Sequence, residues 1–130
     1  MILSFNQERF KHKILEGSKI HSMRLDMNNR WKAGKAIEMW HNSPFNKKAN
    51  PHEFIKSKVV STQKVRLYRY GSLFVAVDDR PLTTGEIKEL AINDGFDTVN
   101  EFAEYFVPVV SNGDPAVWEG KIIHWTDKRY

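Results

Sequence analysis

The spacing of hydrophobic residues predicts three short amphipathic helices. In each of them apolar side chains recur three or four positions apart, which places them on one helix face. The pattern Ser4-x-x-Gln7 predicts the start of the first helix and Gly17 its end, while Thr83-x-x-Glu86 and Thr98-x-x-Glu101 predict the starts of the other two. The apolar faces comprise Phe10 and Ile14; Ile87, Leu90 and Ala91; and Val99, Phe102, Ala103 and Phe106.

Runs rich in β-branched and aromatic residues predict the strands. Residues 20–25 and 36–40 read as short strands, and residues 120–125 as a last one. Residues 58–70 form a longer run that turns at Gly71-Ser72 into residues 73–77, which predicts a hairpin. Between Asn42 and His52, two prolines and three asparagines indicate a loop. We therefore expect one α+β domain, residues 1–130, built on a small curled antiparallel sheet.

Composition narrows the class of protein. The chain has 130 residues, 41% of them hydrophobic, which suffices for one buried core. It has no cysteine, so disulfides, a thiolate nucleophile and zinc–thiolate sites are excluded. No apolar run approaches the roughly 20 residues that cross a bilayer, and the first residues do not resemble a secretory signal. We expect a cytoplasmic protein that does not bind membranes.

Charge is distributed unequally along the chain. Residues 1–70 carry a net charge of +10 and residues 71–130 one of −6, which gives the overall +4. Such asymmetry predicts a positive face that attracts polyanions, unless the two halves fold against each other and their fields cancel. Both arrangements remain open from the sequence.

One segment concentrates candidate chemistry. Residues 17–24, G-S-K-I-H-S-M-R, place Lys19, Ser22 and Arg24 within six positions directly after the first predicted helix. Residues two apart share a face of a strand, so Ser22 and Arg24 would point together. Lys19 joins them only if the chain turns or bulges near Gly17, the residue type that permits such a turn. An ordinary solvated strand end is the alternative.

The order and spacing of these residues resemble the ASCH domains, a family of the PUA-like superfamily. The shared signature is G-x-K-x-x-x-x-R, here from Gly17 to Arg24. The resemblance covers residues 3–41 most clearly and residues 91–106 more weakly. It implies a PUA-like β-barrel with one helix before it and two helices packed on it. Around the signature, Arg9-Phe10, Ile14-Leu15 and the segment Trp31-Lys32-Ala33-Gly34-Lys35-Ala36-Ile37 also match the family.

The resemblance also implies two functions. Some small bacterial ASCH proteins are amidohydrolases that deacetylate acetylated cytidine. Their catalytic lysine and threonine correspond to Lys19 and Ser22, and their glutamate corresponds most closely to Asp94, which is one methylene shorter. Serine keeps the hydroxyl that the chemistry requires. The alternative interpretation, which we favour for this residue, is that Asp94 is an ordinary turn residue at the C-terminal end of a helix.

The other function that the resemblance implies is a binding module for RNA, a nucleotide or a nucleoside. We favour this function over the amidohydrolase. Its ligand-binding residues would be Gly17, Lys19, Ser22, Arg24 and Trp31, and no cofactor is expected. An interaction domain without a ligand is a third interpretation. The five histidines show no metal-binding spacing, except that His41 and His52 border one loop with Glu53 nearby. We therefore predict no metal site.

Overall fold

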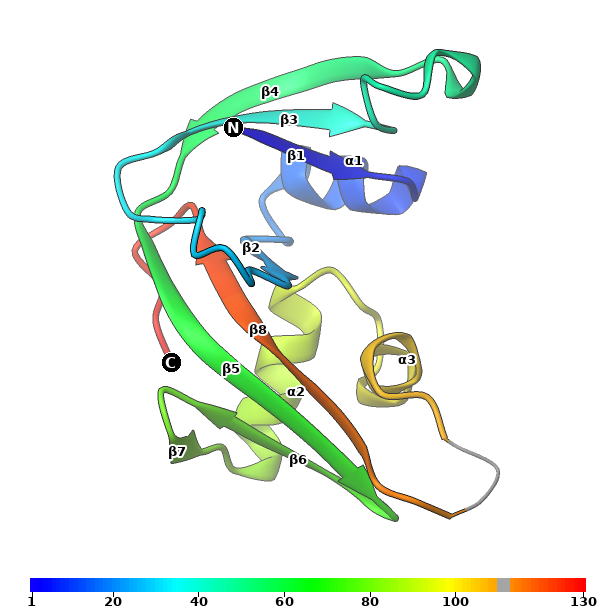
Figure 1. Ribbon diagram of the computed structural model, residues 1–130, viewed down its shortest axis with the longest axis vertical. Helices are drawn as coiled ribbons and strands as arrows, with labels where there is room; N and C mark the ends of the chain where they lie inside the picture. The colour runs from blue at the N-terminus through cyan, green and yellow to red at the C-terminus, as the bar shows by residue number, and fades with distance from the viewer. Residues whose placement is uncertain (110–112) are drawn as a thin grey trace.

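The described residues form an α+β molecule with two β-sheets and three α-helices. This is a computed structural model, and it describes residues 1–109 and 113–130 (Figure 1). In chain order the elements are β1 (Ile2–Phe5), α1 (Glu8–Glu16), β2 (His21–Arg24), β3 (Ala36–His41), the short 3-10 helix η1 (Lys47–Ala49), β4 (His52–Lys58), β5 (Ser61–Tyr70), β6 (Ser72–Val77), β7 (Arg80–Pro81), α2 (Thr84–Asn93), α3 (Val99–Phe106) and β8 (Ala116–His124).

The strands form a three-stranded and a five-stranded sheet. The smaller sheet has the order β1-β3-β4, with β1 parallel and β4 antiparallel to β3. The larger one has the order β2-β8-β5-β6-β7 and is antiparallel throughout. The α+β class is thus confirmed. Within the described residues the strands do not close into a single barrel, so the expected barrel closure is not found.

The start of the chain differs from the prediction. Ser4 does not cap a helix; it lies in β1 and pairs with Trp40 of β3. Leu3 and Phe5 alternate with more exposed neighbours and are both buried, which is the period of a strand. The first helix therefore begins only after Gln7, whose side chain makes no capping bond. Its predicted end is confirmed, because Gly17 adopts a left-handed φ of 90°.

Most of the predicted strand over residues 58–70 is β5, but its first residues are the end of β4 and the junction between the two sheets. The Val59 N–H donates to Lys35 O beside β3, and the Val60 N–H donates to His124 O at the end of β8. The chain passes from one sheet to the other at these two valines, which separates β4 from β5. The hairpin at Gly71 is confirmed, since β5 and β6 pair on either side of it.

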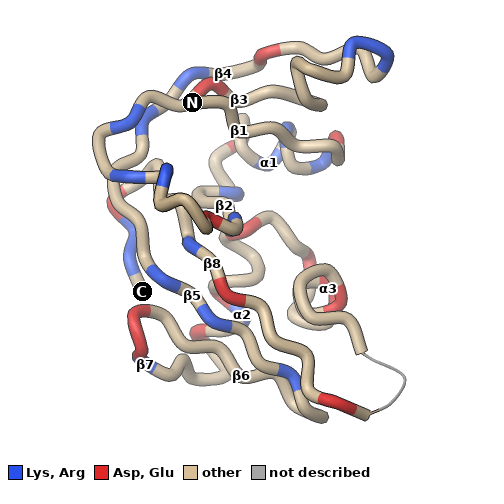
Figure 2. The backbone as a smooth tube through the Cα atoms, in the orientation of Figure 1, with Lys and Arg blue, Asp and Glu red and all other residues tan. Residues whose placement is uncertain are grey.

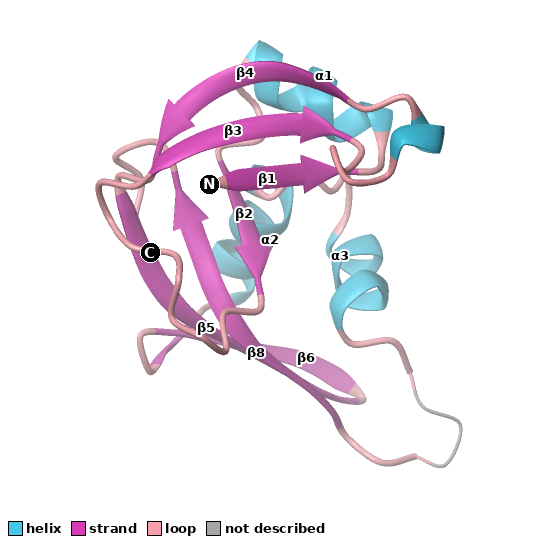
Figure 3. Ribbon diagram, turned by 45° about the horizontal axis from the view of Figure 1, so that its top comes forward, coloured by secondary structure: helices cyan, strands magenta, loops and turns pink. Residues whose placement is uncertain are grey.

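The helices cover the sheets from one side. Figures 1 and 3 show α1 beside the small sheet, and α2 and α3 beside the large one. The predicted caps form: Thr83 and Glu86 make both bonds of a capping box, and Thr98 accepts from the Glu101 N–H. Phe102 is fully buried, as its apolar stripe predicts. No helix in the described part of the chain is long and apolar enough to cross a membrane.

Candidate functional site

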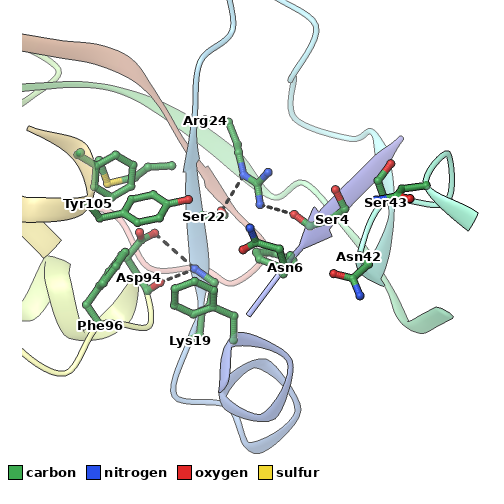
Figure 4. A pocket seen from close by; sticks show the side chains of 15 residues that line it. Ser4, Asn6, Lys19, Ser22, Arg24, Asn42, Ser43, Asp94, Phe96 and Tyr105 are labelled. Atoms are coloured by element: carbon green, nitrogen blue, oxygen red, sulfur yellow. Dashed lines mark hydrogen bonds and ion pairs between the residues drawn. The ribbon is translucent and has the colours of Figure 1, made fainter. Parts of the chain in front are cut away.

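A pocket of about 360 Å³ opens where β1, an edge strand of the small sheet, faces β2, an edge strand of the large one. We call it the lysine pocket. Its lining includes Lys19, Ser22 and Arg24 from the segment 17–24, together with the distant Asp94, all four of which the sequence suggested (Figure 4). The turn at Gly17 carries Lys19 round to the same side as Ser22 and Arg24. Gly17 itself does not line the pocket.

Lys19 is almost completely buried, with 2% of its surface exposed. Its Nζ donates to the carbonyl of His21 at 2.9 Å and to that of Asp94, and it lies 3.7 Å from Asp94 Oδ1. The rings of Phe10 and Phe5 lie 5.0 and 5.4 Å from the ammonium. Burial lowers the pKa of Lys19 to about 8, although the carboxylate of Asp94 acts in the opposite direction.

Asp94 ends helix α2 and connects the pocket to a buried hydrogen-bonded chain. Its Oδ1 lies 3.0 Å from Nδ1 of His21, and the other ring nitrogen of His21 lies 2.6 Å from the Tyr130 hydroxyl. Asn93 donates to that same hydroxyl at 2.9 Å. Burial lowers the pKa of His21, so its ring is neutral near pH 7. His21 does not line the pocket itself, and it orients the Asp94 carboxylate from behind.

Ser22 and Arg24 point together, as expected from their positions two residues apart in β2. Arg24 Nε donates to Ser22 Oγ at 3.1 Å, and Arg24 Nη2 donates to the Ser4 carbonyl at 2.9 Å. Its guanidinium carbon lies 5.0 Å from the centre of the Phe5 ring. Within the described residues, Nη1 has no hydrogen-bond partner and no hydrogen bond joins Lys19 to Ser22. Arg24 can therefore still donate to a ligand.

Several lining residues were not expected from the sequence. Phe96 and Tyr105 form an aromatic wall, and their ring centres lie 5.3 Å apart. Opposite them, amide and hydroxyl side chains form a polar rim (Figure 4). These residues come from loops and from α3, so only the tertiary fold brings them to β2. The rim consists of Asn6, Asn42, Ser43 and Asn46.

Trp31, which the sequence assigned to the ligand site, lies outside the lysine pocket and lines a neighbouring one. The ring centres of His41 and His52 lie 5.3 Å apart, so the two histidines do converge. In the part of the chain that the structure describes, however, no three histidine, aspartate or glutamate side chains form a group able to hold a metal ion.

Comparisons with known proteins return no relatives. Neither the family models nor the curated proteins nor the solved structures include a match to this chain. The function must therefore be inferred from the pocket itself.

Proposed function

We propose that this chain is an ASCH-type domain of the PUA-like class whose lysine pocket binds a nucleotide, free or as part of RNA. In this view the two sheets are the parts of a PUA-like barrel, and the pocket opens between their edge strands. One observation carries the proposal: a partly free arginine and a buried lysine lie beside an aromatic wall and a rim of amides.

Each part of the pocket suits one part of a nucleotide. A nucleobase is flat and can stack on the exposed ring of Tyr105, which the buried Phe96 supports from within the core. The amides of Asn6, Asn42 and Asn46 offer both donors and acceptors to the polar edge of a base. The planar guanidinium of Arg24 suits a phosphate. The volume lies within the ~300–1,000 Å³ typical of small-molecule sites.

The alternative function is deacetylation of an acetylated cytidine. In that reaction Ser22 Oγ would attack the acetyl carbon while its proton passes to neutral Lys19. The C–N bond would then break as Lys19 returns the proton to the leaving amine, and water would hydrolyse the acyl-serine. The lowered pKa of Lys19, about 8, favours this chemistry. Against it, the ammonium donates to two carbonyls and not to Ser22, which is why we favour binding.

Calorimetric titration tests the binding function. Cytidine, uridine, adenosine and guanosine and their monophosphates are compared, and we expect at least one monophosphate to bind. Arg24→Gln should weaken the affinity for that monophosphate about 10-fold or more, because a charge-assisted hydrogen bond to the phosphate is lost. Arg66→Gln is the matched control: this arginine of β5 is exposed, pairs with Glu119 and lies outside the lysine pocket. If no nucleoside or nucleotide binds, the proposal is wrong.

Hydrolysis of acetylcytidine separates the two functions. A binding module shows no turnover, and its affinity tolerates Lys19→Arg better than Lys19→Ala. An amidohydrolase shows turnover in the unmodified protein that both Ser22→Ala and Lys19→Arg abolish, because arginine does not release its proton near neutral pH. Turnover that survives Ser22→Ala would remove Ser22 from the mechanism.

A further inference from the structure

A second pocket, of about 550 Å³, adjoins the lysine pocket. We call it the tryptophan pocket because Trp31 and Trp118 line it. Arg24 is the one charged residue common to the two linings. The two pockets are thus adjacent, and the guanidinium lies between them. The shared residues are Ser4, Met23, Arg24, Tyr105 and Phe106.

The backbone of Trp31 is fixed from both sides. Its N–H donates to Asp26 Oδ2 at 3.0 Å, and its carbonyl accepts from Lys121 Nζ at 3.2 Å. Asp26 and Lys121 form an ion pair of 2.8 Å, and Asp26 Oδ1 also accepts from the Arg30 N–H. The backbone that carries this aromatic side chain is therefore held in place before any ligand arrives, which lowers the entropy cost of binding.

Trp118 lies over the backbone of its own strand. A Cβ atom at Gly120 would lie 2.5 Å from the Trp118 ring and 2.6 Å from the Arg24 carbonyl, so only glycine leaves room there. The Trp118 ring also meets the Phe106 ring edge to face, with 4.9 Å between ring centres. Trp118 is thus held beside β2, next to the residue that joins the two pockets.

We propose that the tryptophan pocket binds a second base, so that the ligand is single-stranded nucleic acid of at least two nucleotides. One base lies in the lysine pocket, the linking phosphate contacts Arg24, and the next base stacks on the Trp31 ring, with Trp118 as a fixed wall of the same pocket. This inference rests on the function proposed above and specifies its ligand class. Two aromatic pockets on either side of one cation match the base–phosphate–base order of such a chain.

The positive charge around the tryptophan pocket suits a polyanionic ligand such as single-stranded nucleic acid. Arg30 and Lys32 flank Trp31 in the sequence, and both are exposed. Figure 2 shows lysines and arginines along the connection from β2 to β3 and along β5. The acidic residues of α3, Glu101 and Glu104, lie outside both pocket linings.

The test compares each nucleoside 3′-phosphate with the matching dinucleoside monophosphate, such as cytidine 3′-phosphate with CpC. Both carry one phosphate and differ by the second nucleoside. In the unmodified protein the dinucleotide should bind about 10-fold more tightly, because one more base stacks. Trp31→Ala should abolish this advantage and leave mononucleotide affinity within about twofold. Tyr70→Ala, an exposed aromatic outside both pockets, should change neither affinity.

The outcomes distinguish the two proposals. Unchanged mononucleotide affinity shows that the Trp31 variant folds, and Trp31→Leu replaces it if the alanine variant does not. If the unmodified protein binds the mononucleotide and the dinucleotide with equal affinity, the second-base inference alone is overturned. It is also overturned if Trp31→Ala weakens the affinity for both ligands equally. Failure of both ligands to bind would overturn the proposed function as well. The chain could instead form a dimer that does not bind the dinucleotide. If Trp31→Ala abolishes that dimer, the tryptophan pocket is a contact with a second copy of the chain and the second-base inference is wrong.

Discussion

Lys19 Nζ and Asp94 Oδ1 lie 3.7 Å apart, with 2% and 3% of their side chains exposed. A charge removed from water is costly unless it is paired, so each group depends on the other. Because the same two side chains line the lysine pocket, the charge of the site and the stability of the fold are linked.

The first prediction concerns alkaline pH. The pKa of Lys19 is about 8 in the fold, against 10.5 for an ordinary lysine, so the unfolded chain binds more protons between these values. The free energy of unfolding should therefore rise from pH 8 to 10.5, by about 3 kcal/mol from this residue. Urea unfolding at several pH values measures the rise, and Lys19→Met should remove it. If the free energy of unfolding of Lys19→Met rises by the same amount over this pH range, the rise comes from other groups and the prediction is wrong.

A second prediction concerns Asp94. Asp94→Ala leaves the Lys19 ammonium buried without its counter-charge and should cost about 3–5 kcal/mol of stability at pH 7. The cost should shrink at pH 10, where Lys19 is neutral. Asp97→Ala is the matched control, because Asp97 pairs with Lys13 at an exposed site, where such pairs contribute about 1 kcal/mol or less. Equal losses in the two variants would show that Asp94 does not compensate Lys19.

A third prediction concerns the core. Phe102 packs in α3 with its ring 5.6 Å from that of Phe96 and 5.1 Å from that of Phe106. Phe102→Ala should therefore lower the free energy of unfolding by about 3–5 kcal/mol. Phe45→Ala, at a ring that is 85% exposed, should change it by about 0.5 kcal/mol or less. Chemical denaturation of both variants compares them, and similar small effects would contradict the burial of Phe102.

Local sequence pattern was sufficient to predict part of the candidate site. Two-residue spacing predicted that Ser22 and Arg24 point together, and Gly17 predicted the turn that brings Lys19 beside them. Asp94 was suggested only by the resemblance to ASCH domains. Helical periodicity and capping patterns predicted α2 and α3 because both signals lie within a few neighbouring residues.

The remainder depends on contacts between distant segments. Strand β1 has only Leu3 and Phe5 as buried positions, too few to outweigh the capping pattern at Ser4, and its partner β3 lies more than 30 residues away. The polar rim comes from loops that carry no local signal of where they fold. Likewise, nothing near Trp31 in the sequence indicates that Lys121 holds its carbonyl.

The location of the bound nucleotide tests the central claim most directly. Amide chemical shifts of the labelled protein are recorded during titration with the monophosphate that binds best. The account predicts that the largest shifts fall on Ser22 and Arg24, on the loop from Asn42 to Asn46, and on Phe96. Shifts confined to β4 and β5, which do not line the lysine pocket, with the pocket residues unperturbed, would contradict the account.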